Sequence, residues 1–404
     1  MNQLEGVRLE KKIILGIQHV LAMFGATVLV PILTGLNPAV ALLAAGCGTL
    51  LFHFVTQGKV PVFLGSSFAF IPVIQMVNEA YGGLEYAQGG IVVAGALYVL
   101  LSFFVKVFGV DTIKSYLPPI VTGPMIMVIG LNLSPVAIRM ASAHWPVAIV
   151  VVLTVIGVSM FAKGFFKLLP ILSGVTVGYI ASLFLGLVDM APMEKAAFLA
   201  IPAITLPKFS FGAIAVIAPI VAVVFMEHIG DITTNGAVVG KDFFKDPGLH
   251  RTLLGDGLAT LFAGMIGGPA NTTYGENTGV LAVTKVYDPS ILRIAAGIAI
   301  GLSFIGKFGA MLQTIPPAVM GGISLILFGM ITSIGMRTVS EGKVDFTSNR
   351  NLIIASLILV IGIGTSVVTD VPVGITITEN IKLNGLSLAA IIGIVSNKLL
   401  PLEK

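Results

Sequence analysis

The sequence predicts an all-α polytopic membrane protein with fourteen transmembrane segments. Of its 404 residues, 56% are hydrophobic and 10% are charged, and the mean hydropathy is +1.02. Soluble domains average about 25% charged residues, so an ordinary soluble fold is excluded. Apolar runs of roughly 17–25 residues follow one another along the chain, and each is long enough for a helix to cross a bilayer. The runs lack the polar–apolar alternation of a membrane β-barrel.

Charged residues, prolines and glycines separate the apolar runs. The third and tenth runs are too short for simple spanning helices, and each is interrupted. The fourteen predicted segments are 13–34, 38–56, 60–77, 89–109, 117–137, 145–162, 168–188, 211–234, 249–266, 270–284, 290–312, 316–335, 351–369 and 384–401.

Loop charge predicts the orientation of the chain. With both termini in the cytoplasm, most of the 23 Lys and Arg residues fall on the cytoplasmic side. This asymmetry favours an even number of spans with cytoplasmic N- and C-termini. The net charge of +4 is therefore assigned to cytoplasmic loops. Nucleic-acid binding is not expected, because no basic run contains interleaved aromatic residues. The basic residues that fall outside are Arg139, Lys195, Lys208, Lys307 and Lys382.

The second half of the chain repeats features of the first. Gln18-His19 recurs as Glu227-His228 after 209 residues, and Phe68 corresponds to Glu276 after 208 residues. Seven spans per repeat is an odd number, so the second copy is predicted to be inverted in the membrane. Inverted repeats with interrupted helices at corresponding positions are typical of secondary transporters, whose site lies near the midplane between the repeats.

The most informative interruption is GGPANTTYGENTGVLAVTK at 267–285. Non-helical backbone at membrane depth is tolerated only where protein or a water-filled cavity meets the freed polar groups. The stretch also contains Glu276, and a carboxylate inside a membrane is costly enough to suggest a function. The alternative is an extracytoplasmic loop that merely has an apolar composition.

The eighth segment adds two more carboxylates. Glu227 and Asp231 are four residues apart and share one helix face, whereas His228 points about 100° away. Two carboxylates deep in an apolar span cannot both be comfortably ionised, so at least one is expected to exchange a proton near neutral pH. The alternative places them at the cytoplasmic end of the helix, where water solvates them.

The two interrupted segments, with Glu227 and Glu276, offer a planar ligand several directional hydrogen-bond partners. Phe68 is expected to supply an apolar edge or face, or else to be ordinary packing. Gln18 and His19 are expected to support the eighth span by hydrogen bonds. His19 and His228 are interpreted as structural histidines rather than proton carriers. The lone Cys47 excludes a disulfide framework or a thiolate metal site.

Several stretches together resemble the nucleobase–ascorbate transporters, and within that family the bacterial uracil permeases. The resemblance covers nearly the whole chain, and Glu276-Asn-Thr-Gly279 with Thr284-Lys285 is similar to the family's signature motif. The matching stretches are QHVLAMFGATVLVP (18–31), GKVPVFLGSSFAF (58–70), EHIGD (227–231), DPGLHR (246–251), NTTYGENTGVLAVTKVY (271–287) and IPPAVMGGISLILFG (315–329).

The resemblance implies two inverted sets of seven segments, with short strands in segments three and ten that cross at the site. A core domain is expected from residues 1–110 and 209–313, and a gate domain from 111–208 and 314–404. The core would move as an elevator against a homodimeric gate in a bacterial inner membrane. The coupling ion is a proton, and neither a metal nor another cofactor is expected.

The resemblance also implies roles for single residues. Side chains matching Glu227 and Glu276 hold the base, together with backbone at positions matching Phe68 and Gly275. Asn277, within the signature motif, is expected to join Gln18, His19 and His228 in supporting the site. Proton coupling is assigned to Glu227 and Asp231.

One position departs from the uracil pattern, and this leaves the substrate open. Uracil permeases of the family often have His where Asp231 stands, whereas xanthine and urate carriers commonly have Asp. The expected function is proton-coupled import of a nucleobase, uracil first, with xanthine or urate as the alternative. An anion exchanger or channel would favour a cationic or uncharged site over these carboxylates. An intramembrane enzyme is not expected, because the chain has no HExxH pair and no thiolate cluster.

Overall fold

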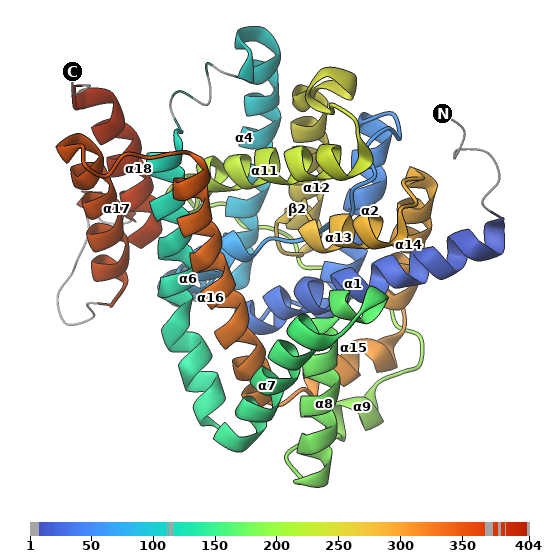
Figure 1. Ribbon diagram of the computed structural model, residues 1–404. Coiled ribbons are helices and arrows are strands. Elements are labelled where there is room, and N and C mark those ends of the chain that lie inside the picture. Colours follow the sequence, from blue (N-terminus) through green and yellow to red (C-terminus); the bar gives the residue numbers. More distant parts are fainter. Residues whose placement is uncertain are drawn as a thin grey trace.

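The computed structural model describes residues 8–110, 112, 115, 117–367, 375–378, 381–383 and 385–401. Residues 1–7 and 402–404 at the two predicted cytoplasmic ends lie outside the described residues, as does the end of the thirteenth predicted segment. Helices make up most of the described chain (Figure 1).

The first half contains α1 (Leu9–Thr34), α2 (Pro38–Val55), β1 (Leu64–Ser66), η1 (Phe68–Phe70), α3 (Ile71–Tyr81), α4 (Leu84–Phe108), α6 (Pro119–Ser142), α7 (Trp145–Phe161), η2 (Gly164–Leu168), α8 (Pro170–Phe184) and α9 (Ala191–Lys195). The second half contains α10 (Phe211–Ile217), α11 (Ile220–Val239), η3 (Phe244–Gly248), α12 (Leu249–Ile266), β2 (Asn271–Thr273), α13 (Gly275–Thr284), α14 (Pro289–Ser303), α15 (Gly306–Gln313), α16 (Pro317–Glu341), α17 (Asn349–Val367), β3 (Ile375–Thr378), β4 (Ile381–Leu383) and α18 (Gly385–Leu399).

Within the described chain, six helical stretches are long and apolar enough to cross a membrane. Five further helices of the described chain are apolar but shorter, so fourteen crossings remain a prediction. A helix of 15 residues is only about 22 Å long, against a hydrocarbon core of about 30 Å. The six stretches are Leu9–Thr34, Pro38–Val55, Leu84–Phe108, Pro119–Ser142, Phe211–Val239 and Pro317–Glu341.

Local sequence explains where many of these helices begin and end. Pro38 opens α2, where its missing N–H costs nothing, and the Asn37 side chain accepts a hydrogen bond from the Ala39 backbone at 2.9 Å. Asp288 caps α14 in the same way, one residue before a proline. Gly35 ends α1 in the left-handed conformation at φ 81°, which glycine adopts without a steric penalty.

Two predicted segments are divided in the structure. The eighth is split between α10 and α11 next to Pro219, whose ring removes a backbone donor from the helix. The eleventh is split between α14 and α15, where Ile305 forms a bridge with Leu199 of the loop between α9 and α10. Apolar periodicity does not register such breaks, because the hydrophobic pattern continues through them.

The helices pack in two groups. In one group, α12 packs against α4 and α2, α14 packs against α2 and α1, and the paired strands lie among them. In the other group, α16 packs against α6 and α7, and α17 packs against α18 and α6. Figure 1 shows α6 and α16 side by side, with α17 and α18 along one flank. The groups touch where α1 meets α8 and where α11 meets α6 and α18.

Glycines allow the closest helix contacts in both groups. A β-carbon on Gly95 of α4 would lie 2.9 Å from the Gly257 carbonyl oxygen of α12. A β-carbon on Gly335 of α16 would lie 2.6 Å from the Gly123 carbonyl oxygen of α6. Small residues at such contacts are typical of membrane helices, where packing rather than the hydrophobic effect drives association.

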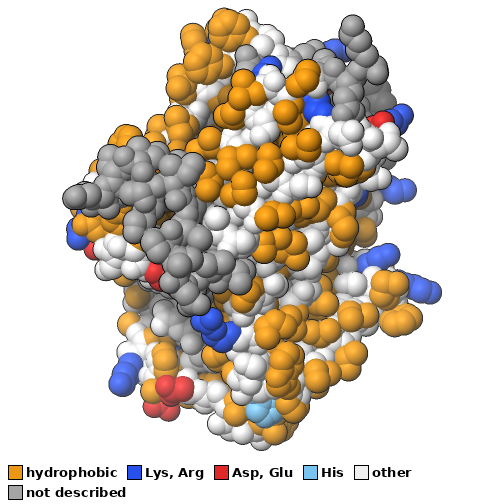
Figure 2. Space-filling view, turned by 90° about the vertical axis from the view of Figure 1, so that its left-hand side faces the viewer, with side chains coloured by type: hydrophobic (Ala, Val, Ile, Leu, Met, Phe, Trp, Pro, Cys, Tyr) orange, Lys and Arg blue, Asp and Glu red, His pale blue; other side chains and the backbone are white. Residues whose placement is uncertain are grey.

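The outer surface is apolar, as a lipid-facing surface must be. Figure 2 shows hydrophobic side chains across one face, with charged side chains mostly toward its margins. Large apolar side chains such as Phe161 (82% exposed) and Phe184 (88% exposed) stand on this outer surface. Exposed apolar area on this scale is rare in soluble monomers, so it indicates contact with lipid or protein.

Candidate functional site

Two short strands from opposite halves of the chain pair at the centre of the first helix group. β1 and β2 are antiparallel, with Gly65 opposite Thr272. The pairing continues past both strands, because the Ser67 N–H donates to the Ala270 carbonyl at 2.8 Å and the Tyr274 N–H donates to the Phe63 carbonyl at 3.0 Å. Each strand leads directly into a helical segment, η1 after β1 and α13 after β2.

The strand pair is held rigidly by side chains. The Tyr274 hydroxyl donates to the Ser66 carbonyl at 2.9 Å, and its ring lies over Gly65. A β-carbon on Gly65 would come within 2.3 Å of that ring, so only glycine fits. The Thr49 hydroxyl of α2 accepts from the Leu64 N–H at 2.9 Å. The backbone entering η1 and α13 is therefore fixed in place.

Polar side chains of α12 and β2 complete this support. The Thr260 hydroxyl donates to the Asn271 carbonyl at 2.9 Å, and the Asn271 amide donates to the Ala44 carbonyl at 3.0 Å. The Asn235 amide of α11 donates to the Pro61 carbonyl and to the Thr278 hydroxyl. These bonds connect α11 to both interrupted segments. Each of these amide nitrogens has a partner, and such buried hydrogen bonds favour one arrangement of the segments.

The three predicted carboxylates gather around the start of α13. Thr273 donates its hydroxyl to Asp231 Oδ2 at 2.7 Å, and Asp231 Oδ1 lies 3.9 Å from the position of a β-carbon on Gly275. Glu276 lies in the first turn of α13, where the helix dipole favours a negative charge. Glu227 lies one turn before Asp231 on α11 and interacts electrostatically with Glu276. All three carboxylates are half-buried, and Gly275 is exposed.

In this arrangement the three carboxylates lie near the start of α13. Phe68 opens η1, is half-buried, and packs at the edge of two hydrophobic clusters; η1 contacts α11. The exposed start of α13 and the carboxylates thus lie together, and η1, which carries Phe68, contacts the same helix α11. Such a site can accept N–H donors from a planar ligand and donate to its carbonyl groups.

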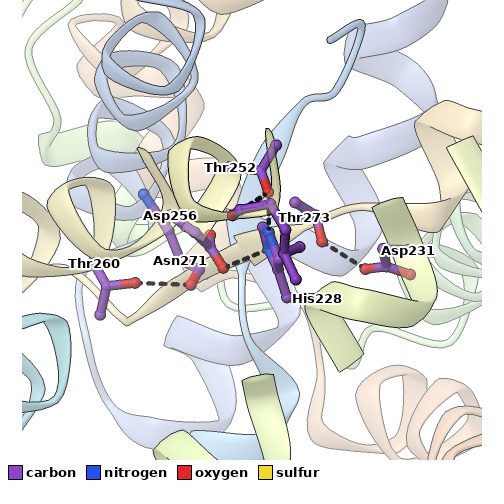
Figure 3. A network of polar contacts seen from close by, with 8 residues as sticks. His228, Asp231, Thr252, Asp256, Thr260, Asn271 and Thr273 are labelled. Atoms are coloured by element: carbon purple, nitrogen blue, oxygen red, sulfur yellow. Dashed lines mark hydrogen bonds and ion pairs between the residues drawn. The ribbon is translucent and has the colours of Figure 1, made fainter. Parts of the chain in front are cut away.

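The supporting residues separate into two places. His19 of α1 contacts Asn277 of α13, whose amide nitrogen lies 3.0 Å from both His19 Nδ1 and the His19 carbonyl oxygen. His228 points instead to α12, where it contacts Asp256 and Thr252 (Figure 3). Gln18 is half-buried, and its amide oxygen has no hydrogen-bond partner among the described residues.

Some residues of this region were not predicted. Asp256 is fully buried between Gly255 and Gly257 in α12, and the rule that singled out Glu276, a carboxylate within an apolar span, applies to it equally. Thr273 and Asn235 carry no comparable signal, because threonine and asparagine are common and their partners are distant in sequence. His53, to which no role was assigned, binds the Val62 carbonyl through Nε2 at 2.8 Å.

The fold and the carboxylate site together define a membrane transport protein, and comparison with known proteins identifies its family. The sequence model of a permease family (Xan_ur_permease) matches residues 10–371. The chain therefore belongs to this permease family, the nucleobase–ascorbate transporters, and it is a permease rather than an enzyme.

The chain is similar to curated relatives over almost its full length. It is 46% identical to a probable uracil permease of Haemophilus influenzae, over 98% of this chain and 95% of the relative. It is 42% identical to a uracil permease of Bacillus subtilis, over 96% and 92%. It is 43% identical to a uracil permease of Escherichia coli K12, over 94% and 89%.

Solved structures share the fold at low sequence identity. The murine solute carrier 26 family member A9 anion transporter in its inward-facing state superposes with a TM-score of 0.69 at 11% identity, over 97% of this chain and 68% of that one. The transmembrane domain of the cyanobacterial bicarbonate transporter BicA gives 0.60 at 16% identity, over 89% and 96%. These likenesses establish a mostly helical membrane transporter fold.

Proposed function

We propose that the protein imports a nucleobase, uracil first, across a bacterial inner membrane by proton symport. The observation that carries the proposal is the gathering of Glu227, Asp231 and Glu276 at the exposed start of α13 beside the strand pair. Uracil presents ring N–H donors and carbonyl acceptors in one plane. Glu227 and Glu276 accept from the N–H groups, and backbone N–H groups near Phe68 and Gly275 donate to the carbonyls.

Proton coupling follows from the charge of this site. A ligand drives a conformational change only through different affinities for the two states, so the proton must change the affinity for the base. Protonation of Glu227 or Asp231 lets the base enter without leaving an additional unpaired carboxylate in a half-buried site. The base and the proton are then released inside the cell, and the empty carrier returns to its outward-facing state.

The proposed mechanism divides the chain into a moving core and a fixed gate. The fourteen segments form two inverted sevens, with β1 and β2 in the interrupted third and tenth segments. The core contains residues 1–110 and 209–313, and the gate contains 111–208 and 314–404. The two packing groups support this division, because most helix contacts stay within one group. The gate forms a homodimer, and both termini lie in the cytoplasm.

Asp231 supports a second candidate substrate, xanthine or urate. Its carboxylate is held by Thr273 beside Gly275, so a larger base could reach it as a further acceptor. The relatives named uracil permeases favour uracil. The anion transporters share only the fold, at low sequence identity.

Binding to the purified protein in lipid nanodiscs tests the substrate. Labelled uracil is expected to bind, with xanthine and urate competing at least tenfold less well. If xanthine displaced the bound label better than unlabelled uracil did, the protein would be assigned to the purine transporters of the family. Displacement by bicarbonate or chloride, with no retention of any base, would contradict the nucleobase assignment. Glu276→Gln, which removes one acceptor, serves as the matched site control.

A further inference from the structure

The helix that carries Glu227 and Asp231 has a second polar contact on another face. His228 of α11 is fully buried, and its ring lies between two residues of α12 (Figure 3). Nδ1 is 3.1 Å from Asp256 Oδ2, and Nε2 is 3.0 Å from Thr252 Oγ1. Asp256 is also fully buried. Two titratable groups thus meet where α11 packs on α12, on a different face of α11 from Glu227 and Asp231.

The hydrogen-bond partners restrict where the protons lie. The Thr252 hydroxyl has one hydrogen, and it lies 3.0 Å from the Leu249 carbonyl oxygen, which can only accept. When Thr252 donates there, its oxygen accepts from His228, so Nε2 carries a hydrogen. Nδ1 then faces Asp256 Oδ2. With Nε2 protonated, a neutral imidazole and an ionised carboxylate would oppose two lone pairs at this contact, so a further proton lies between them.

With the Thr252 hydrogen on the Leu249 carbonyl oxygen, two protonation states satisfy this geometry. One is imidazolium with carboxylate, and the other is neutral imidazole with carboxylic acid. Both states are electrically neutral as a pair, and both keep the Nε2 hydrogen on Thr252. The other titratable groups whose charge reaches this region are Tyr98 of α4 and Glu227 and Asp231 of α11. A neutral pair is the state that least disturbs these neighbours in a dry interior.

We propose that His228 and Asp256 keep one shared proton throughout the transport cycle, and that Asp256 is a positioning residue. Acting through His228, Asp256 sets the rotation of α11 that presents Glu227 and Asp231 to the start of α13. The proposal rests on the proposed function for its effect on transport. It implies that the transported proton is carried elsewhere.

Substitution of Asp256 separates positioning from proton carriage. In Asp256→Asn the amide nitrogen donates to Nδ1 of a neutral imidazole, so every contact is kept while the titratable group is lost. In Asp256→Ala the buried Nδ1 loses its partner. Uracil uptake into proteoliposomes with and without an inward proton gradient is measured for both variants. His228→Gln, which retains a donor for Thr252 and loses the contact with Asp256, is the companion variant.

The expected result is a split between the two Asp256 variants. Asp256→Asn keeps KM within about twofold of wild type and the same stimulation by the gradient. Asp256→Ala raises KM about tenfold, the size expected when one buried polar group is left unpaired. Loss of gradient stimulation in Asp256→Asn, with uptake down the uracil concentration gradient retained, would overturn the proposal. If wild type transports no base, the proposed function fails, and the shared proton is judged by spectroscopy.

The spectroscopic test does not depend on transport. The chain has five histidines, so 15N-histidine labelling gives few signals, and His228→Gln identifies the one that matters. We expect a protonated Nε2 and a hydrogen-bonded Nδ1 that do not change between about pH 5 and 8, where a free histidine titrates. A His228 signal that titrates in this range, or an Nε2 without hydrogen, would overturn the proposal. Folding of Asp256→Ala is not needed for this result.

Discussion

The two halves of the chain bring different chemistry to the same strand pair. The first half contributes β1, an apolar ring at Phe68, and His19 paired with a neutral amide. The second half contributes β2, three carboxylates, and a histidine paired with an acid. The comparison suggests a division of labour, in which one half supplies rigid backbone and an apolar wall and the other supplies charge.

The largest expected effect comes from disturbing the backbone contribution of the first half. Gly65→Ala places a methyl group within 2.3 Å of the Tyr274 ring, so the ring must move and its bond to Ser66 is lost. Overpacking of this kind costs about 1–3 kcal/mol. Thermal unfolding in detergent should show a clear decrease in Tm together with loss of uracil binding.

Gly297→Ala is the matched control for this substitution. A β-carbon there meets no atom within 4 Å, and alanine is favoured over glycine in a helix such as α14. Its Tm should equal or exceed that of wild type. An equal loss of Tm in both variants would mean that the Gly65 contact with Tyr274 has no special role.

The second effect compares Glu276 with its repeat counterpart Phe68. Glu276→Gln removes a charged acceptor, and hydrogen bonds to charged groups are worth about 1.5–3 kcal/mol, so uracil binding should weaken about ten- to hundredfold. Phe68→Leu keeps an apolar wall and should weaken binding only a few-fold. Titration of labelled uracil onto protein in nanodiscs compares the two. A greater loss in Phe68→Leu would reverse the proposed division of labour.

These contrasts separate what the sequence could predict from what it could not. Glu227, Asp231 and Glu276 are visible because charge is rare inside apolar spans, and their clustering followed from the repeat. The partners of the two histidines were not predictable, because Asn277 and Asp256 become neighbours only through helix packing. The breaks at Pro219 and Ile305 were also missed, since the apolar pattern continues across them.

The third effect concerns Asn277→Asp, which would give His19 an acidic neighbour, as Asp256 is for His228. The Asn277 amide nitrogen donates toward both Nδ1 and the carbonyl oxygen of His19, so His19 is neutral with its hydrogen on Nε2. Asn277→Asp places a carboxylate against that carbonyl oxygen in a fully buried position. The free energy of unfolding should decrease by about 1–3 kcal/mol. Unchanged thermal stability would show that the amide orientation is not required.

The smallest effect lies at residues outside the predicted segments 13–34 and 290–312. Lys12 of α1 pairs with Asp288, the cap of α14, at 2.7 Å. Partial burial acts to raise the pKa of Asp288, but Lys12 and Ser290 outweigh it, so its pKa lies below the usual value. A lowered pKa contributes stability above the unfolded-state pKa, and that stability is lost as the pH falls through the folded-state pKa.

Asp288→Asn keeps the cap and removes the ion pair. At neutral pH it should lower the free energy of unfolding by less than about 1 kcal/mol, as is usual for partly exposed pairs. The difference from wild type should shrink as the pH falls below about 4, near the ordinary aspartate pKa. Thermal unfolding in detergent across this range measures it. A difference that grows on acidification would contradict the assigned sign.

The central claim is that carboxylates of the second half couple base import to a proton. The most direct test is accumulation of labelled uracil in proteoliposomes, with and without an inward proton gradient, for wild type and Glu227→Gln. The account predicts accumulation above equilibrium only with the gradient in wild type, and none in Glu227→Gln. Accumulation that ignores the gradient, or that survives unchanged in Glu227→Gln, would contradict it.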